Sequence, residues 1–458
     1  MEALRHFQKY LYIARTALRS PFAHGVLFLL AVLVFHFEKP VEGAITFLWI
    51  VMLYLLVCDD FCSVLLPLLF PAAFVLTAYD GYALFSPYMW MLIPAAFCLI
   101  LHLAVYRHPI KLGEHFTGSL AVAVALTLGG AFYISARDYF AGAAIYHVLM
   151  LGFGMLLIYL LMRSDIEAHD SEEITRRFML YMYLWGLFAA YMVGEHCIGF
   201  FLENKEAMLA GKLSLNFQWR NNISTVLMLC MPFPLYFARK GPWHVLACVL
   251  MYAALLCTSS RGGILFGTVE MALLIPYAVL VGKGRWRKLA NFAVLLACAL
   301  AFFFLHRQYD LSFFFKRLLD GNIVEEGEAR VLLIDRAIEG FKAAPIFGQG
   351  IGYSGNSDLY NPRQGAMYFY HMFIPQVIGS MGLVGILAYL WQIILRVRSA
   401  LLRIGPRTLC LFLSYIGVLL MSQVNPGEFV PLPYELITVA LFVLIEKQEK
   451  RNPFKRKA

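Results

Sequence analysis

The sequence contains few charged residues. Charged side chains make up 15% of the 458 residues, hydrophobic residues make up 61%, and the mean hydropathy is +0.69. Soluble domains carry about 25% charged residues. The shortage of charge excludes an ordinary soluble domain and predicts an all-α protein that crosses a membrane many times.

The sequence also lacks the usual patterns of a metal or disulfide site. Its nine cysteines lie almost entirely inside apolar runs and show no paired spacing, and no aspartate-rich cluster is present. We therefore expect packing cysteines, no metal and no cofactor. The net charge of +9 does not require nucleic acid as a partner, because the basic tail from Lys447 to Lys457 is typical of an anchor at anionic lipid.

No cleavable signal peptide is visible, so the first apolar run is predicted to be a signal anchor. Fourteen apolar runs are long enough, or nearly so, to cross a bilayer, and two very short turns leave an expected count of about 12–14. The runs lie near residues 23–38, 41–57, 61–79, 88–106, 117–134, 139–162, 178–202, 222–238, 243–258, 262–281, 289–305, 371–395, 408–424 and 430–445.

Lysine and arginine set the expected orientation. With the N-terminus inside, most of the 38 basic residues fall in cytoplasmic segments, and both termini are cytoplasmic. The acidic turn at Asp59 and Asp60 fits this arrangement poorly. The predicted division is eleven spans in residues 1–305, a large extracytoplasmic loop with helices in 306–370, and three spans with the basic tail in 371–458.

A helix is predicted inside the large loop, from Arg330 to about Lys342. Its apolar side is expected to contain Ile334, Ala337, Ile338 and Phe341. Arg330 falls within this apolar stripe, where an unpaired arginine is costly. Either its side chain extends to water, or it binds an anionic ligand in a pocket facing the membrane.

The turn Thr258–Gly263 places Arg261 at the outer membrane boundary, where a helix begins. Hydroxyls such as Ser260, the guanidinium and the free N–H groups of a helix N-terminus together suit a diphosphate. The alternative is an interface arginine reaching water. Arg220 and Asn222 lie beside an interface tryptophan and are expected to contact a head group.

His371 opens the twelfth apolar run, again at the predicted outer boundary, and either caps the helix or does chemistry. Gly379, Gly382 and Gly385 follow at intervals of three, so we expect one helix face that another helix approaches closely. The topology predicts Arg261, Arg330 and His371 around one outward-facing cavity beneath the loop. Glu195, His196 and Glu270 are ionisable residues in or near apolar runs to which no role is assigned.

Three motifs in order resemble the bacterial O-antigen ligase and O-antigen polymerase superfamily, over about residues 215–390. These are the Ser-Arg-Gly turn, an arginine followed by a proline and Gly-x-Gly-x-Gly, and a histidine followed by two glycines. The matching residues are Ser260, Arg261, Gly262, Arg330, Pro345, Gly348, Gly350, Gly352, His371, Gly382 and Gly385. The chain departs from the family in having Met372 where it has Asn and Ile334 where it usually has Trp.

The resemblance implies a glycosyltransferase with the GT-C-like membrane architecture, in the cytoplasmic (inner) membrane and active on its extracytoplasmic face. Such enzymes move a glycan from a polyprenyl (undecaprenyl) diphosphate carrier to an acceptor sugar without a metal or nucleotide sugar. Arg261 and Arg330 are then expected to hold the diphosphate, and His371 to be the catalytic base. Direct attack predicts inversion at the anomeric carbon.

A polymerase is favoured over a ligase that transfers to lipid A core, because a polymerase holds two carrier diphosphates and needs more cations on the outer face. Basic residues for a second anionic site are Lys205, Lys212, Arg220, Arg336 and Arg363. The alternative of another class is a transporter or flippase of lipid-linked sugars. A transporter is expected to have broken helices and polar groups near the midplane, whereas here the polar groups cluster at one predicted face.

Overall fold

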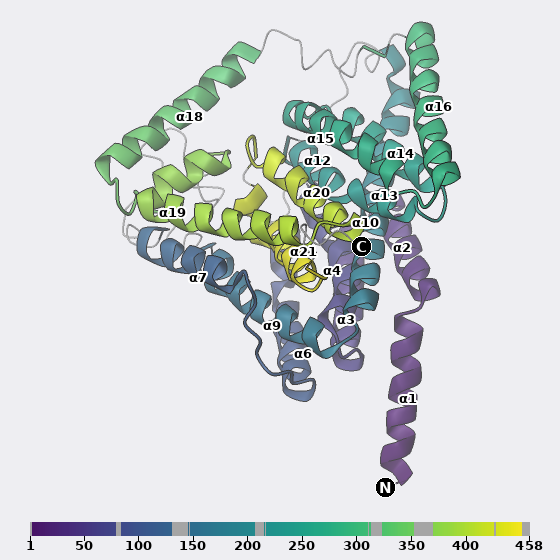
Figure 1. Cartoon of the computed structure of the whole chain (residues 1–458), viewed down its shortest axis with the longest axis vertical. Coiled ribbons are helices and arrows are strands. Elements are labelled where there is room, and N and C mark those ends of the chain that lie inside the picture. Colours follow the sequence, from purple (N-terminus) through teal and green to yellow (C-terminus); the bar gives the residue numbers. More distant parts are fainter. Residues whose placement is uncertain are drawn as a thin grey trace, which may run out of the picture. The chain divides into compact units, whose positions relative to one another are not determined.

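The computed structural model of the chain describes residues 2–78, 84–130, 145, 147–206, 215, 217–309, 311–312, 323–351, 370–425 and 427–450. Within these ranges the regular elements are all helices, and there is no strand, as the sequence predicts (Figure 1). The chain forms two compact units that do not follow chain order. Unit 1 comprises Met1–Pro109 and Asp165–Arg317, and unit 2 comprises Ile110–Ser164 and Leu318–Ala458. The predicted division at residues 305 and 370 stays a prediction.

Unit 1 is organised around the long helix α10 (Ser171–Glu203), which packs against α2, α4, α12 and α14. Aromatic side chains fill its core: Phe188 meets Phe70 and Phe74 edge to face, with ring centroids 5.4 and 5.8 Å away. The other elements are α1 (Glu2–Leu18), α2 (Pro21–His36), α3 (Pro40–Val57), α4 (Phe61–Thr77), η1 (Ser86–Met91), α6 (Leu92–Val105), α12 (Phe217–Cys230), α13 (Pro232–Phe237), α14 (Trp243–Cys257), α15 (Arg261–Leu280) and α16 (Arg285–Tyr309).

Unit 2 is organised around α19 (Phe373–Leu402), which packs against α7 and α18. The second half of α19 is fixed by a buried ion-pair group: Arg396 binds Glu428 at 3.1 Å and Glu435 at 2.7 Å. The other elements are α7 (Phe116–Ala125), η2 (Leu126–Gly130), η3 (Val148–Gly154), α9 (Met155–Ala168, whose last residues belong to unit 1), α18 (Ile323–Ala343), α20 (Pro406–Met421), η6 (Gly427–Phe429), η7 (Pro431–Glu435) and α21 (Leu436–Glu446).

Seven helical segments in the described part of the chain are long and apolar enough to cross a membrane, or eight if the bent pair α1–α2 forms one span. All fourteen predicted runs overlap a helix, but several helices are short, so a count of about 14 and the GT-C class are not confirmed. The seven segments are Pro40–Val57, Ser86–Val105, Val148–Ala168, Ser171–Glu203, Arg261–Leu280, Arg285–Tyr309 and Phe373–Leu402.

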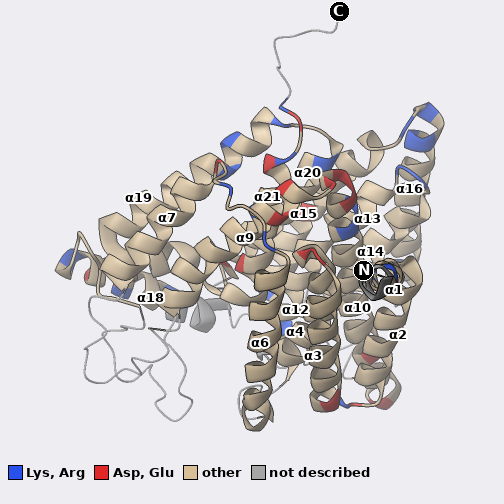
Figure 2. Cartoon of the chain, turned by 90° about the horizontal axis from the view of Figure 1, so that it is seen from below, with Lys and Arg blue, Asp and Glu red and all other residues tan. Residues whose placement is uncertain are grey.

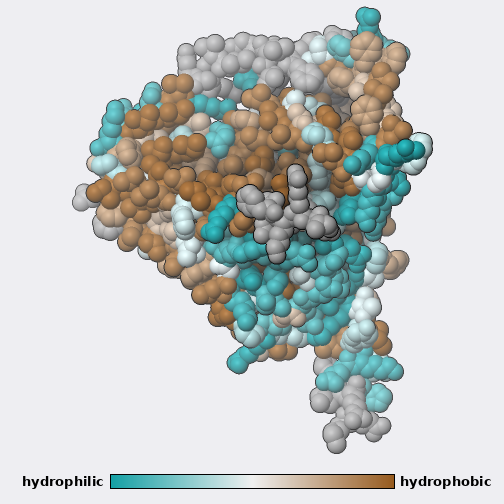
Figure 3. Space-filling model, viewed as in Figure 1, coloured by the Kyte–Doolittle hydropathy of each residue, from teal (hydrophilic) through white to brown (hydrophobic). Residues whose placement is uncertain are grey.

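The surface also fits a bilayer. Only 6% of the apolar window of α16 and 11% of that of Ser86–Val105 are buried inside the protein, so long apolar faces are left uncovered. Charged residues lie at the ends of α2, α3 and α6, whose bodies carry none (Figure 2), and brown apolar residues cover much of the visible face (Figure 3). The chain is therefore an integral membrane protein.

The acidic turn at Asp59 and Asp60 is neutralised inside unit 1. Arg15 binds Asp59 at 2.9 Å, Arg177 binds the fully buried Asp60 at 3.2 Å, and Arg19 binds both carboxylates. Burial alone raises the pKa of Asp60, but the charges of Arg177 and Arg19 outweigh it and hold that pKa below its usual range. These acids are structural, which explains why they fit the charge rule poorly.

Candidate functional site

The turn before α15 is built around the hydroxyl of Ser260. This side chain caps the helix by accepting from the Gly263 amide at 3.1 Å and donates to Asn221 at 2.9 Å. Gly263 is needed for packing, since a Cβ there would lie 2.6 Å from the Ser224 hydroxyl oxygen. Arg261 is the first residue of α15, and its side chain is half-buried. The cap thus fixes the direction in which Arg261 leaves the helix.

The hydrogen bond from Ser260 to Asn221 joins two segments that the sequence treats separately. Arg220 and Asn222 flank Asn221 at the start of α12, so both lie next to the Arg261 turn within unit 1. Asn222 donates to the carbonyl of Leu76 at 3.4 Å. Sequence reasoning missed Asn221, because nothing in its spacing reveals which residue completes the cap.

In unit 2 the predicted helix around Arg330 is present as α18, but its packed face differs from the prediction. Ala337 is buried as expected, whereas Ile334 and Ile338 are 38% and 41% exposed. Leu333 is buried in their place. It packs together with Ala337 against Tyr370 and Met372, the residues just before α19, so the packed face of α18 includes residue 333 and not residue 334. Arg330 lies three residues before Leu333 on this face and is half-buried.

The helix α19 is interrupted at Gly382, whose φ of 57° and ψ of −148° are not helical. The interruption exposes the carbonyls of residues 379 and 380 and the amides of residues 383 and 384, which an unbroken helix would pair with each other. A segment from the large loop binds all four. Gln349 and Gly350 donate to the two carbonyls at 2.9 and 3.0 Å, and residues 383 and 384 donate to the carbonyls of Pro345 and Ile346 at 2.9 and 3.1 Å.

The glycines of this junction are required by close backbone contact. Gly348 has a φ of 72°, and a Cβ on it would lie 2.4 Å from the Met381 nitrogen. A Cβ on Gly382 would lie 2.7 Å from the Gly348 nitrogen. The prediction of one continuous helix face opposite another helix is therefore wrong at Gly382: the turns of residues 345–350 occupy a break in the helix.

His371 lies on a short strap immediately before α19. Its neighbours Tyr370 and Met372 are buried and pack against Leu333 and Ala337 of α18, whereas His371 itself is exposed. Its φ of 54° is in the left-handed region, which a residue with a side chain adopts only at a cost. Two buried anchors on either side thus hold the imidazole outward in a strained backbone conformation.

Further contacts hold the strap in position. The buried Gln376 accepts from the Tyr370 amide at 2.9 Å and donates to Ser380 at 2.9 Å. Gly379 leaves room for the Tyr370 ring, because a Cβ there would lie 2.9 Å from it. Sequence reasoning did not identify Tyr370 or Gln376 as positioning residues, although a glutamine in an apolar run is a signal that could have been used.

Arg330 and His371 come together in unit 2. Although the side chain of His371 is exposed at the surface, protein atoms packed around it reduce its solvation and lower its pKa, and the positive charge of Arg330 lowers that pKa further. A lowered pKa keeps the imidazole neutral near pH 7, which is the form that accepts a proton. Arg261 belongs to unit 1, so a single cavity shared by all three residues stays a prediction.

The other predicted binding residues differ in setting. The hydroxyl of Ser260 already donates to Asn221 and accepts from the Gly263 amide, so that one lone pair remains for a further contact. Arg336 on α18 is half-buried, and its Nε has no hydrogen-bond partner within the described ranges. Lys205 lies over the ring of Phe201 at 5.8 Å. Lys212, Gly352 and Arg363 lie outside the described residues.

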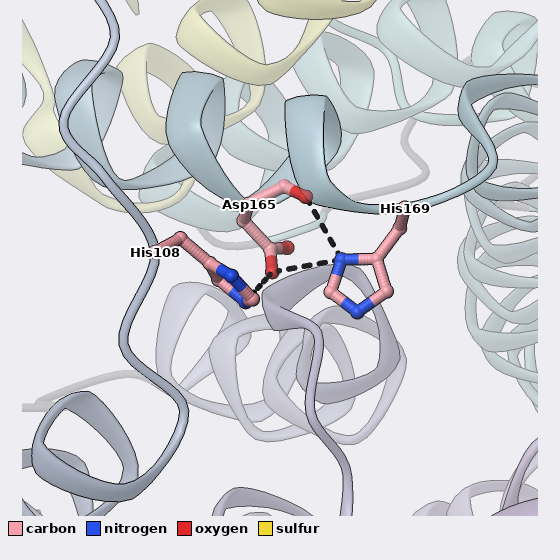
Figure 4. Close-up of side chains that lie close together, drawn as sticks. All are labelled: His108, Asp165 and His169. Atoms are coloured by element: carbon pink, nitrogen blue, oxygen red, sulfur yellow. Dashed lines mark hydrogen bonds and ion pairs between the residues drawn. The ribbon is translucent and has the colours of Figure 1, made fainter.

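One group in unit 1 has the composition of a metal site. His108, Asp165 and His169 bring three ligand atoms within 4.8 Å of one another (Figure 4). Both imidazoles lie near the same carboxylate oxygen of Asp165, at 3.6 and 3.4 Å. However, Nδ1 of His169 donates to the backbone carbonyl of Asp165 at 2.8 Å. That nitrogen therefore carries a hydrogen and is not free to bind a metal, and the contacts with the Asp165 carboxylate are ion pairs when the imidazoles are protonated.

Comparison with known proteins adds one result. Residues 246–390 match a protein-family model described as O-antigen ligase. The matched segment is less than half of the chain and contains Arg261, Arg330, His371 and the glycine junction, whereas Arg220 and Asn222 lie outside it. Neither a search of curated proteins nor a search of solved structures found a match. The predicted resemblance to the O-antigen ligase and polymerase superfamily is confirmed.

Proposed function

We propose that this protein, whose residues 246–390 match the O-antigen ligase family, transfers a glycan from undecaprenyl diphosphate to an acceptor sugar. The reaction takes place at the extracytoplasmic face of the inner membrane, without a metal or cofactor. The observation that carries the proposal is His371, which is held outward in strained backbone beside the charge of Arg330. The proposal keeps the GT-C-like architecture with both termini cytoplasmic.

The proposed reaction is a single displacement. The acceptor hydroxyl oxygen forms a bond to the anomeric carbon while the bond from that carbon to the diphosphate oxygen breaks. The lipid diphosphate leaves with the electron pair, and the hydroxyl proton moves to the neutral imidazole of His371. The guanidinium of Arg330 stabilises the charge that develops on the diphosphate. Attack from the opposite side inverts the anomeric carbon.

Arg261 is proposed as a second guanidinium for the diphosphate. The cap formed by Ser260 and Asn221 fixes its backbone, and Arg220 and Asn222 flank Asn221. Two guanidiniums can bind a diphosphate through paired hydrogen bonds. The substrate contacts expected of Ser260, Arg220, Asn222 and Arg336 remain part of the proposal.

Interrupted helices such as α19 also occur in transporters, the alternative class of function for this chain. In transporters, free backbone groups at a helix break bind the substrate or a coupling ion. Here the four groups released by the break are bound by residues 345–350 of the same unit. The break therefore has no free backbone groups at these positions to offer a ligand, which favours the enzyme over the transporter.

The acceptor decides between polymerase and ligase, and we favour the polymerase. Purified protein in nanodiscs is supplied with one lipid-linked repeat unit and nothing else. A polymerase produces a ladder of lengthening lipid-linked glycans. A ligase produces no ladder and transfers once, when a lipid A core acceptor is added. Absence of transfer in both reactions would overturn the proposed function.

A further inference from the structure

Unit 1 contains a cavity of about 590 Å³ where α2, α4, α10 and the start of α12 converge. This volume is within the range of about 300–1,000 Å³ found for small-molecule sites. Its apolar wall is aromatic, with Phe35, Phe74, Phe200 and Trp219 in the lining. By the predicted topology, the cavity opens near the outer membrane boundary.

The polar lining has one kind of charge. Among the described residues, Glu38, Glu195 and Glu203 line the cavity, and no lysine or arginine does. His36 contacts Glu195, with Nδ1 and Oε1 2.7 Å apart. A lining with more carboxylates than basic groups repels a diphosphate, and carboxylates accept hydrogen bonds from hydroxyl groups. The chemistry of this lining differs from that of the arginine sites described above.

Two polar atoms in the cavity lining have no hydrogen-bond partner among the described residues. They are Oε2 of Glu195, an acceptor, and Nε1 of Trp219, a donor; both residues line the cavity, but these two atoms are covered by their surroundings. Buried polar atoms are usually paired, so such exceptions need an explanation. The partly exposed carboxylate of Glu195 beside an aromatic wall suits a ligand that carries both hydroxyl groups and an apolar ring face.

We propose that this cavity binds a sugar ring of the transferred glycan. The ring packs its C–H face against the aromatic wall that includes Trp219, and its hydroxyls donate to the carboxylate of Glu195, whose side chain is 29% exposed. The inference rests on the proposed function and assigns a role to Glu195, which sequence reasoning left without one. Trp219 immediately precedes Arg220 and lies two residues before the Asn221 that caps the Arg261 turn, so sugar and diphosphate contacts follow each other along α12.

The chain offers a matched pair of substitutions as a test. Gly199 lines the cavity, and a Cβ on it would meet nothing within 4 Å. Gly194 is on the same helix, does not line the cavity and is equally open. A phenylalanine at residue 199 therefore fills the cavity without displacing backbone, whereas Gly194→Phe controls for the added bulk on α10.

The experiment measures binding separately from transfer. Mild acid releases the phosphate-free oligosaccharide from the cell's polyprenyl-linked glycan, and its binding to protein in nanodiscs is followed by saturation-transfer NMR. Gly199→Phe, Trp219→Ala and Glu195→Gln should each weaken binding at least tenfold, about 1.4 kcal/mol. Gly194→Phe and Trp49→Ala, a change of an exposed tryptophan on α3, should leave it unchanged. Sugar-free undecaprenyl diphosphate should bind Gly199→Phe as well as it binds the wild type.

Each outcome decides the inference. Equal oligosaccharide binding by Gly199→Phe and wild type, or no binding by wild type, overturns the sugar site even if the wild type transfers glycan. Loss of diphosphate binding together with sugar binding in Gly199→Phe also overturns it, because the cavity would then not be specific for sugar. Selective loss of sugar binding, with no glycan transfer by the wild type, supports the site and rejects only the proposed reaction.

Discussion

Replacing Gly382 with alanine tests the junction between residues 345–350 and the break in α19. The residue has a φ of 57° and a ψ of −148°, a conformation open almost only to glycine. Its new Cβ would lie 2.7 Å from both the Gly348 nitrogen and the Pro345 oxygen, and backbone atoms cannot rotate away. Strain and overpacking each cost about 1–3 kcal/mol, so we expect a combined loss of about 2–6 kcal/mol.

The assay is unfolding in mixed micelles, combined with hydrogen exchange at the amides of Gln349, Gly350, Leu383 and Val384. These amides are bonded across the junction, so Gly382→Ala should speed their exchange. The control Gly194→Ala, at an open helical position, should be neutral or stabilising by up to about 1 kcal/mol. A Gly382→Ala protein with wild-type stability and unchanged exchange would refute the backbone pairing described here.

Two further predictions concern the arginines. Arg330→Met removes a charge that lowers the pKa of His371, so that pKa should rise and the acid limb of the rate profile should move to higher pH. NMR titration measures the shift, with His371→Ala used to assign the imidazole signal. An unchanged pKa would mean that the two groups are not coupled. Arg261→Ala should reduce kcat/KM for glycan transfer about 10²–10³-fold with normal membrane insertion. Arg261→Lys should recover little of this, because lysine lacks the planar fork, and full recovery would reduce Arg261 to a simple charge.

The sequence was sufficient to predict the helical membrane class, and each predicted apolar run overlaps a helix, because long apolar runs have few alternatives. It did not predict α1, and the expected count of about 14 spans is not confirmed. It was less informative about which face of α18 packs. Helical periodicity placed Ile334 and Ile338 with Ala337, but the partner surface of Tyr370 and Met372 selects Leu333. In a membrane protein, exposed isoleucines are tolerated on the lipid side, so apolar periodicity does not identify the packed face.

The candidate site shows the same limit. Arg330 and His371 stood out by their places in the sequence, and the resemblance to a known family linked them with the glycines. The reason for the glycines could not be predicted, since four backbone hydrogen bonds between residues 345–350 and 379–384 depend on tertiary pairing. The cavity beside Glu195 also depends on the convergence of helices far apart in the chain. From the sequence alone, Glu195 and His196 could be recognised as ionisable residues near a membrane boundary, but the cavity beside them could not be predicted.

The most direct test of the central claim compares wild type with His371→Gln in single-turnover transfer from a lipid-linked repeat unit at several pH values. We predict that the wild-type rate falls as pH drops through the lowered pKa of His371. His371→Gln should be about 10²–10⁴-fold slower and should no longer show this fall at low pH, while its affinity for the donor is preserved. A His371→Gln protein that transfers at the wild-type rate with the same pH dependence would contradict the account.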